Sequence, residues 1–83
     1  MNFGEALEKL KGGLRVQRAG WNGKGMWLTL LRPGTGPLDA EYASDPPLAI
    51  DPCIAMRTAT GTLQPGWLAS QADMLAEDWT VLD

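Results

Sequence analysis

Cys53 is the only cysteine in this 83-residue chain. Neither a disulfide within the chain nor a cysteine-based zinc site is therefore available to hold the fold together. A domain of this length buries only roughly 60% of the surface that its unfolded chain exposes, so its core is marginal. Because disulfides, a metal or a partner subunit usually support such domains, the sequence predicts self-association.

The chain contains no histidine. This removes the commonest general base and the commonest metal ligand, and it leaves serine or cysteine nucleophiles without an imidazole partner. We therefore expect no catalytic residues, no metal site and no cofactor. The enzymatic alternative that remains is acid–base chemistry by carboxylates, with Asp73 or Glu77 as candidates.

Charge is distributed unevenly along the chain. Six basic and two acidic residues give residues 1–32 a charge of +4, whereas one basic and eight acidic residues give residues 33–83 a charge of −7. The net charge of −3 argues against a DNA or RNA binder, which usually has a basic excess. The basic half suits a small phosphorylated ligand; alternatively, the two halves attract each other within a fold or an oligomer.

Neither a membrane span nor a secretory signal is expected. No apolar run approaches the roughly 20 residues that cross a bilayer. The first residues lack the basic and then apolar order of a secretory signal. Together with the lone cysteine, these features predict a cytosolic protein that contacts no membrane.

Local patterns predict one small α+β domain over residues 1–83, with an antiparallel sheet, an N-terminal helix and a short second helix. The helices are expected at residues 2–12 and about 70–77, each opened by a capping box. The predicted strands cover residues 14–18, 26–31, 54–59, 62–64 and 79–82. In the first strand, Leu14 and Val16 are expected to point inward. Pro65 places the fourth strand at a sheet edge or ends it there.

Two segments lack the regular alternation of apolar and polar residues that is typical of a half-buried strand. Both faces of residues 26–31 are apolar, which is typical of a strand buried on both sides or lying at a subunit contact. Residues 33–52 carry five of the six prolines and lack clear periodicity. We interpret them as a surface excursion with at most a short strand or turn near residues 48–50, since a structureless loop of about 20 residues is unusual in a compact domain.

Four tryptophans are the main candidates for ligand contact. Trp27 and Trp79 lie in apolar strands and are predicted to pack. Trp21 and Trp67 are bordered by glycine, where a ring can face a cleft. Stacking a nucleobase on such a ring contributes about 1–3 kcal/mol. For both, an ordinary half-buried ring is the alternative.

Polar groups accompany both of these rings. Near Trp21, two cations, an amide and three glycines suit a phosphate that the backbone can approach closely. After Trp67, residues 70–73 begin a helix, and a helix N-terminus suits an anion or a ribose. The spacing predicts a polar, aromatic cleft without identifying its ligand.

Three ordered motifs also carry a family resemblance: MNFGEAL at residues 1–7, RAGWNGKGM at 18–26 and WLASQADMLAEDW at 67–79. Over residues 1–32 and 54–82 the chain resembles the phage Thoeris anti-defence two family. The resemblance implies a homotetramer, with pockets between protomers, in the cytoplasm of an infected bacterium. It implies a sponge that holds cyclic ADP-ribose isomers, such as glycocyclic ADP-ribose made by Thoeris TIR enzymes, without cleaving them. Some members also capture cyclic oligonucleotides at separate sites.

The predicted ligand contacts come from the first helix and the two motifs that follow it in the chain: Phe3, Arg18, Trp21, Asn22, Lys24, Trp67, Ser70, Gln71 and Asp73. Under the resemblance, Trp21 and Asn22 hold base and ribose. Residues 70, 71 and 73 complete the pocket from the same or a neighbouring chain, and residue 3 adds a wall. Residues 18 and 24 are expected phosphate contacts on charge alone.

The segment 33–52 matches no family pattern, which leaves the preferred isomer open. Two other functions also stay open: hydrolysis of a nucleotide signal, and direct inhibition of a host immune protein.

Overall fold

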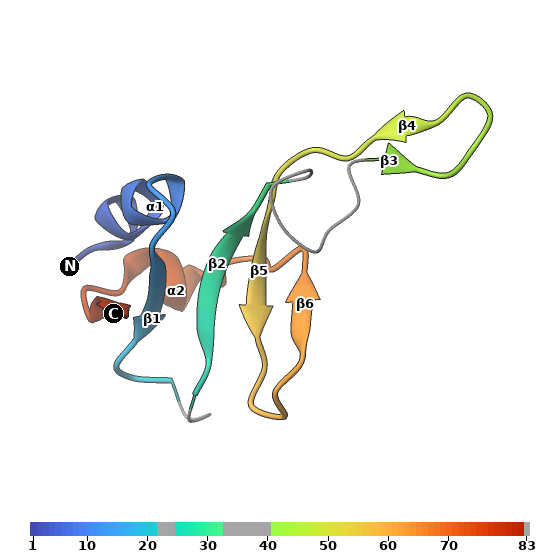
Figure 1. The fold of residues 1–83 in the computed structure, drawn as a ribbon. Coiled ribbons are helices and arrows are strands. Elements are labelled where there is room, and N and C mark those ends of the chain that lie inside the picture. The colour runs from blue at the N-terminus through green and yellow to red at the C-terminus, as the bar shows by residue number, and fades with distance from the viewer. Residues whose placement is uncertain (22–24, 33–40, 83) are drawn as a thin grey trace.

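Five antiparallel strands form the sheet on which the molecule is built, in the order β6-β5-β2-β1-β7 (Figure 1). Their bounds are β1 Arg15–Arg18, β2 Trp27–Leu31, β5 Cys53–Arg57, β6 Leu63–Pro65 and β7 Trp79–Leu82. This computed structural model describes residues 1–21, 25–32 and 41–82. With one helix before the sheet and a short second helix, the predicted α+β class is confirmed.

The first helix, α1 (Phe3–Lys11), begins as the sequence predicted. The side chain of Asn2 accepts from the backbone N–H of Glu5 at 2.8 Å, and the Glu5 carboxylate accepts from the Asn2 N–H at 3.0 Å. Gly12 caps the far end. The side chains of Ala6 and Leu10, four residues apart, are fully buried against the sheet, because positions i and i+4 share one helix face.

Leu14 does not point inward as predicted; its side chain is 43% exposed. Gly13 takes a φ of +90°, and the N–H of Leu14 donates to the carbonyl of Lys9 at 3.0 Å. Leu14 therefore belongs to the end of α1, and the strand starts one residue later at Arg15. Val16, the second inward prediction, is fully buried.

The core lies between α1 and the β7-β1-β2 side of the sheet. It consists of Ala6, Leu10, Val16, Leu28 and Trp79. The main chain of residue 79 also holds the N-terminus: the Met1 ammonium donates to its carbonyl at 2.9 Å, and its N–H donates to the Met1 carbonyl at 3.1 Å. The predicted packing of Trp79 is confirmed.

β2 is buried unevenly. Leu28 is fully buried, whereas the other four residues of the strand are half-buried. Trp27 lies outside the core, and the guanidinium of Arg15 lies 4.9 Å above its ring centroid. Trp27 therefore packs, as predicted, but against a side chain of the neighbouring strand β1 and not against the core.

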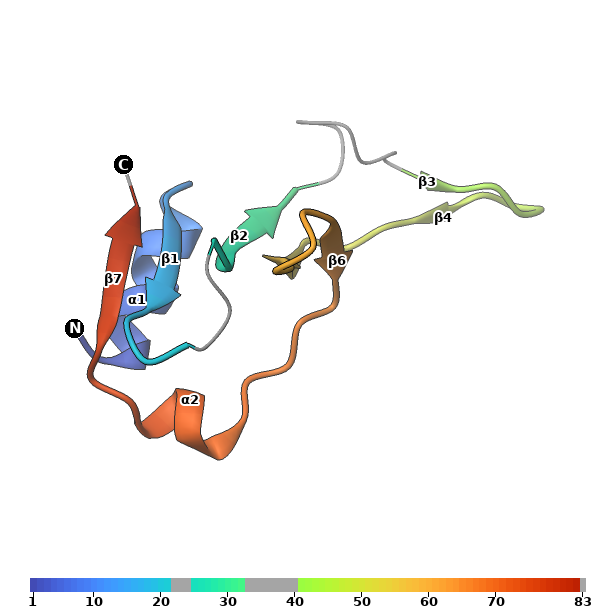
Figure 2. The ribbon, with the colours of Figure 1, turned by 90° about the horizontal axis from the view of Figure 1, so that it is seen from below.

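The chain crosses from one edge of the sheet to the other after β6. β6 is an edge strand, as Pro65 predicted, and residues 66–78 with the helix α2 (Gln71–Leu75) lead to β7 at the opposite edge (Figure 2). The predicted capping box of α2 is present: Ser70 Oγ accepts from the Asp73 N–H at 3.1 Å, and Asp73 Oδ2 accepts from the Ser70 N–H at 3.1 Å.

α2 ends at Leu75, two residues before the predicted end. The indole Nε1 of Trp79 donates to the carbonyl of Asp73 at 3.0 Å. That carbonyl would accept the N–H of Glu77 in a continued helix. Ala76 is extended instead, with ψ of 150°, and turns the chain back to the sheet.

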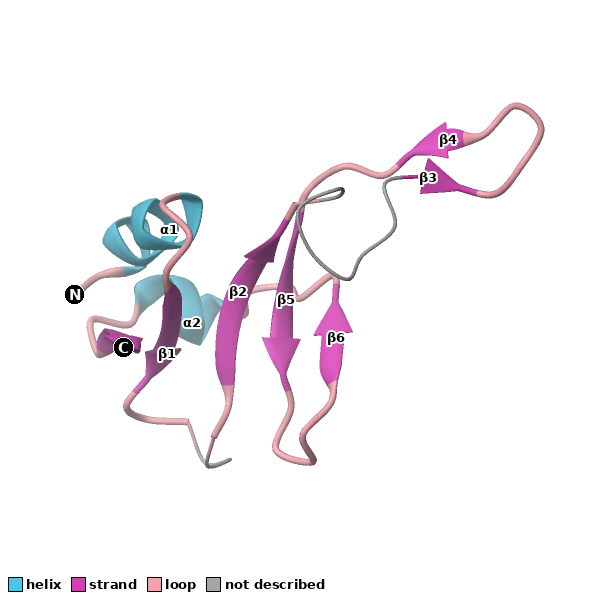
Figure 3. Cartoon of the chain, viewed as in Figure 1, coloured by secondary structure: helices cyan, strands magenta, loops and turns pink. Residues whose placement is uncertain are grey.

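The described part of the predicted excursion forms a short two-stranded arm. β3 (Glu41–Tyr42) pairs with β4 (Leu48–Ala49), and Figure 3 shows this arm standing apart from the five-stranded sheet. All of residues 41–49 are exposed. The short strand expected near residues 48–50 is confirmed, whereas its partner β3 was missed; residues 33–40 lie outside the described residues.

Candidate functional site

Four aromatic rings from four separate segments meet at one end of the core. Trp79 lies at the centre, with Phe3 at 5.5 Å and Trp21 at 5.4 Å between ring centroids. Trp67 completes the cluster at 6.3 Å from Trp79 and 6.4 Å from each of the other two rings. The three outer rings are half-buried, so part of each faces solvent. The structure thus brings together the three aromatic residues that the sequence predicted as ligand contacts.

Two ring contacts and one hydrogen bond hold Trp21 in this cluster. Its ring meets Trp79 and Trp67 in edge-on geometry, at interplanar angles of 81° and 64°. Its Nε1 donates to Asp73 Oδ1 at 3.3 Å. Such edge-to-face pairs are a preferred arrangement of aromatic rings. The indole therefore has a defined orientation in the free chain.

Arg18, at the end of β1, connects this cluster to two carboxylates. Its Nη1 donates to Asp73 Oδ1 at 2.8 Å, and its Nε donates to Asp78 Oδ1 at 3.0 Å. Both ion pairs join the basic half of the sequence to the acidic half, which supports the interpretation that the halves attract each other within the fold. The three groups together carry one net negative charge. Arg18 is committed to these partners, and its predicted contact with phosphate stays a prediction.

The carboxylate of Asp73 is the most densely bonded polar group of the site, and only 12% of its side chain is exposed. Burial by itself would raise its pKa. The hydrogen bonds from Arg18, Ser70 and Trp21 together outweigh that effect and hold the pKa of Asp73 below its ordinary value. The side chain is therefore a carboxylate acceptor at neutral pH, poorly suited to act as a general acid.

Asp78 has the same partner in a more exposed setting. The hydrogen bond from Arg18 lowers its pKa most, burial opposes that change, and the backbone N–H of Gly20 lowers the pKa further. Reciprocally, the hydrogen bonds to Asp73 and then Asp78 raise the pKa of Arg18. The Asp78 side chain is 34% exposed and ion-paired.

The turn that carries Trp21 is anchored at its first and last glycines. At its start, the N–H of Gly20 donates to Asp78 Oδ2 at 2.8 Å, and a Cβ on Gly20 would lie 2.9 Å from that oxygen. At its end, Arg57 Nη1 donates to the carbonyl of Gly25 at 2.9 Å. Gly25 has a φ of +78°, and a Cβ there would lie 2.5 Å from Arg57 Nη1. The positive φ favours glycine at position 25, whereas a side chain at position 20 would require the Asp78 carboxylate to shift.

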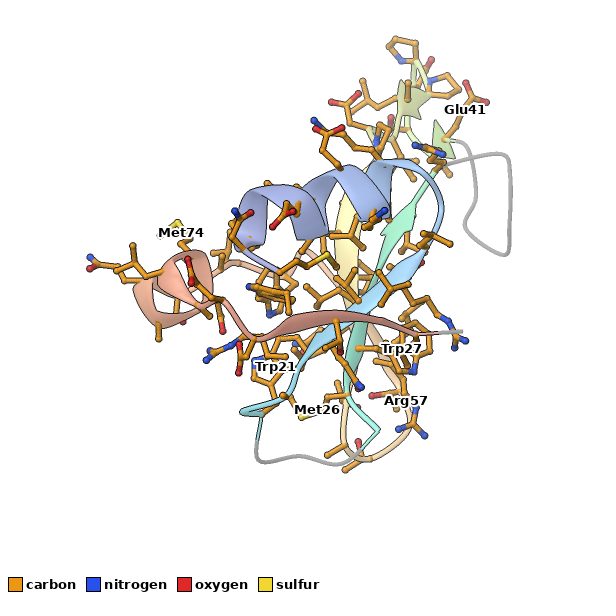
Figure 4. The ribbon with its side chains drawn as sticks, turned by 90° about the vertical axis from the view of Figure 1, so that its left-hand side faces the viewer. Trp21, Met26, Trp27, Glu41, Arg57 and Met74 are labelled. Carbon is orange, nitrogen blue, oxygen red and sulfur yellow. The ribbon has the colours of Figure 1, made fainter. Side chains whose placement is uncertain are left out.

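The remaining predicted contacts are less closely joined to the cluster. Ser70 and Gln71 are exposed at the start of α2, where Ser70 is hydrogen-bonded to Asp73, so their side chains are accessible. Asn22 and Lys24 lie outside the described residues. Figure 4 shows Trp21 beside β1, and Met74 pointing away from the body of the molecule.

Sequence reasoning missed the contributions of Asp78, Arg57 and the indole of Trp79. No local signal marks Asp78, because Arg18 lies 60 residues away in the chain.

In the described ranges, no three His, Cys, Asp or Glu side chains are grouped so that they could hold a metal ion. None of the described helices combines the length and apolarity that a membrane span requires.

Comparison with known proteins gives two matches across nearly the whole chain. The model of the Tad2-like family, the Thoeris anti-defense 2-like domain, matches residues 1–82. The matched range includes the segment 33–52, which the sequence motifs alone left outside the resemblance. A curated relative, "Thoeris anti-defense 2" of Bacillus phage SP01, is 41% identical over 87 residues, covering 99% of this chain and 94% of the relative.

Proposed function

This chain belongs to the Thoeris anti-defense 2-like family and is therefore a Thoeris anti-defence protein, and on that premise we propose that it is a sponge. It captures a cyclic ADP-ribose isomer, such as glycocyclic ADP-ribose, in the cytoplasm of the infected host. It holds the signal without cleaving it, so that the downstream effector is never activated. The observation that carries the proposal is the aromatic cluster of Phe3, Trp21 and Trp67 around Trp79, joined to a network of polar groups.

The cluster offers the chemistry that an adenine ring requires. Three half-buried rings expose part of their surfaces, and every nucleobase has a face that can stack on such a ring. Each stacked base contributes about 1–3 kcal/mol. Because Trp21 is already oriented by its ring contacts and by Asp73, little conformational entropy is lost when a base stacks on it.

Polar groups near the rings supply partners for ribose and phosphate. The accessible side chains of Ser70 and Gln71 lie at the start of α2, three and four residues after Trp67 in the chain. Asn22 and Lys24, in the turn anchored at Gly20 and Gly25, are proposed to complete the contacts. A hydrogen bond to a charged group contributes about 1.5–3 kcal/mol. Two stacked rings and a few such bonds approach the roughly 12 kcal/mol that nanomolar affinity needs.

Capture without turnover fits the carboxylates of the site. The Asp73 carboxylate accepts three hydrogen bonds, one of them from its ion-pair partner Arg18, and its pKa is lowered. A general acid needs a pKa near the working pH. The Asp73 carboxyl is thus a structural and binding group in this proposal, not a proton donor.

We further propose that the chain assembles as a homotetramer, in which neighbouring copies complete the pocket. Apolar side chains around α2 favour a protein contact there: Leu68 is 88% exposed, Leu75 is 79% exposed and Met74 is 47% exposed. These three side chains flank Ser70 and Gln71 in the sequence. Light scattering coupled to size exclusion then gives four times the 9.0 kDa mass of one chain, whereas a monomer would contradict the assembly.

Isothermal titration calorimetry tests the function. Glycocyclic ADP-ribose titrated into the protein is expected to give saturable heat with a nanomolar Kd, and linear ADP-ribose much weaker binding. A cyclic dinucleotide titrated into the saturated protein tests the separate oligonucleotide site that the resemblance implies. Absence of heat with every nucleotide would contradict the sponge and favour direct inhibition of a host protein.

A further inference from the structure

Two separate contacts fix Trp21: one holds its ring and one holds the backbone just before it. Asp73 Oδ1 accepts from the indole Nε1 at 3.3 Å, and Asp78 Oδ2 accepts from the N–H of Gly20 at 2.8 Å. The Trp21 N–H also donates to the Arg18 carbonyl at 3.3 Å, which closes a tight turn at the end of β1. Backbone and ring are therefore oriented by different carboxylates.

Arg18 ties these two carboxylates to each other. It donates to Asp73 Oδ1 at 2.8 Å and to Asp78 Oδ1 at 3.0 Å, and its own side chain is only 19% exposed. Each carboxylate thus uses oxygen lone pairs for Arg18 and for the Trp21 turn at once. Charge-assisted hydrogen bonds of this kind are short and directional. A displacement of Asp78 would consequently move both Gly20 and Arg18.

We infer that Arg18 and Asp78 are positioning residues for ligand capture: without touching the ligand, they hold the Gly20–Trp21 turn in the orientation that stacking requires. The inference rests on the proposed function. It gives Asp78 a role that no motif assigned, and it gives Arg18 a task different from the phosphate contact expected from its charge.

The direction in which ligand affinity changes when Asp78 loses its charge distinguishes a positioning role from simple charge repulsion. A cyclic ADP-ribose isomer carries negative phosphates, so removing a nearby carboxylate strengthens its binding if charge alone matters. If Asp78 positions the turn, removing its charge weakens binding instead. The two explanations predict changes in opposite directions.

The test compares Asp78→Asn with Glu77→Gln, which removes the same charge from the preceding, exposed residue. With glycocyclic ADP-ribose as the calorimetric probe, Asp78→Asn is expected to raise Kd about tenfold or more, as loss of a charged hydrogen bond does. Glu77→Gln is expected to leave Kd unchanged or slightly lower. An unchanged or lower Kd for Asp78→Asn would overturn the inference.

A second variant perturbs the same contact without altering any charge. In Gly20→Ala the new Cβ lies 2.9 Å from Asp78 Oδ2 and displaces the carboxylate, which Arg18 holds on its other side. We expect a loss of affinity like that of Asp78→Asn, and no further loss when both changes are combined. Additive losses would mean that the two residues act independently and would contradict the inference.

Nuclear magnetic resonance of the free protein supplies a readout that does not depend on ligand. In Asp78→Asn, the indole N–H of Trp21 and the amide of Gly20 are expected to shift and to exchange faster with solvent, while the indole of Trp79 keeps its protection. If those signals are unchanged, the positioning role is refuted even where Kd rises. If the wild-type chain binds no nucleotide, the proposed function fails, and the unliganded spectra still report whether the network orients Trp21.

Discussion

Replacing Trp21 by alanine affects both stability and ligand capture, and the structure allows each effect to be sized. The ring makes edge-on contacts at 5.4 Å with Trp79 and at 6.4 Å with Trp67. Each aromatic pair contributes about 0.5–1.5 kcal/mol beyond area burial. Because the side chain is half-buried, we expect Trp21→Ala to lower the free energy of unfolding by about 2–4 kcal/mol, near the low end for large aromatic truncations.

The variant is nevertheless expected to fold. A chain of 83 residues has a free energy of unfolding of about 4–12 kcal/mol at typical values per residue. Urea denaturation followed by far-UV circular dichroism measures the loss, as a fall of about 1–2 M in the transition midpoint. If the midpoint is unchanged, Trp21 is not packed in the cluster.

The same variant is expected to bind glycocyclic ADP-ribose about 5- to 150-fold more weakly, which corresponds to the loss of one stacked base. Trp21→Phe keeps a ring but loses the Nε1 donor to Asp73, so it is expected to lie between wild type and Trp21→Ala in both assays. Trp27→Ala is the matched control, because that half-buried ring lies outside the core cluster and packs against Arg15. It is expected to lose stability and keep its Kd. Wild-type affinity in folded Trp21→Ala would refute the stacking argument.

Three further predictions concern stability. Trp79→Phe removes the indole donor to the buried Asp73 carbonyl and leaves a small cavity, so urea denaturation should show that the free energy of unfolding falls by about 2–4 kcal/mol. A fall below about 0.5 kcal/mol would contradict the packing of Trp79. Gly25→Ala forces a Cβ into a backbone with φ of +78° and against Arg57, so the same assay should show a loss of about 1–2 kcal/mol or more. Acid should also destabilise the fold, because the pKa values of Asp73 and Asp78 are lowered in the folded chain. Their contribution to the free energy of unfolding is fully present above the ordinary carboxyl pKa of about 4, and it is lost as the pH falls through the folded-state pKa values. The urea midpoint is expected to drop between pH 5 and pH 2, and to drop less in Arg18→Met; equal drops would show that the ion pairs are not responsible.

Local sequence signals predicted the elements of the fold well. Both capping boxes, at Asn2 and Ser70, depend on contacts within four residues, and both helices start where these patterns indicated. Pro65 correctly identified an edge strand because a missing N–H is a local property. Errors arose at the ends of the two helices, where hydrogen bonds that end a helix override the apolar pattern. The N–H of Leu14 donates to the carbonyl of Lys9, and the indole of Trp79 takes the carbonyl that would have extended α2.

The candidate site was predictable only in part. Glycine neighbours marked Trp21 and Trp67 as rings that could face a ligand, and the structure brings them within 6.4 Å of each other. Their stacking role stays a prediction. The ion pairs from Arg18 to Asp73 and Asp78 span 55 and 60 residues, and no spacing rule in a single sequence connects residues so far apart.

Recovery of the captured molecule shows whether the protein holds its ligand intact or cleaves it. Excess protein is incubated with glycocyclic ADP-ribose, separated from free ligand and denatured by heat, and the released nucleotide is identified by chromatography and mass spectrometry. A sponge is expected to return the bound ligand intact and in full, in proportion to the protein present, and folded Trp21→Ala is expected to retain far less. Release of linear ADP-ribose or another cleavage product would contradict a sponge and show that the protein is a hydrolase.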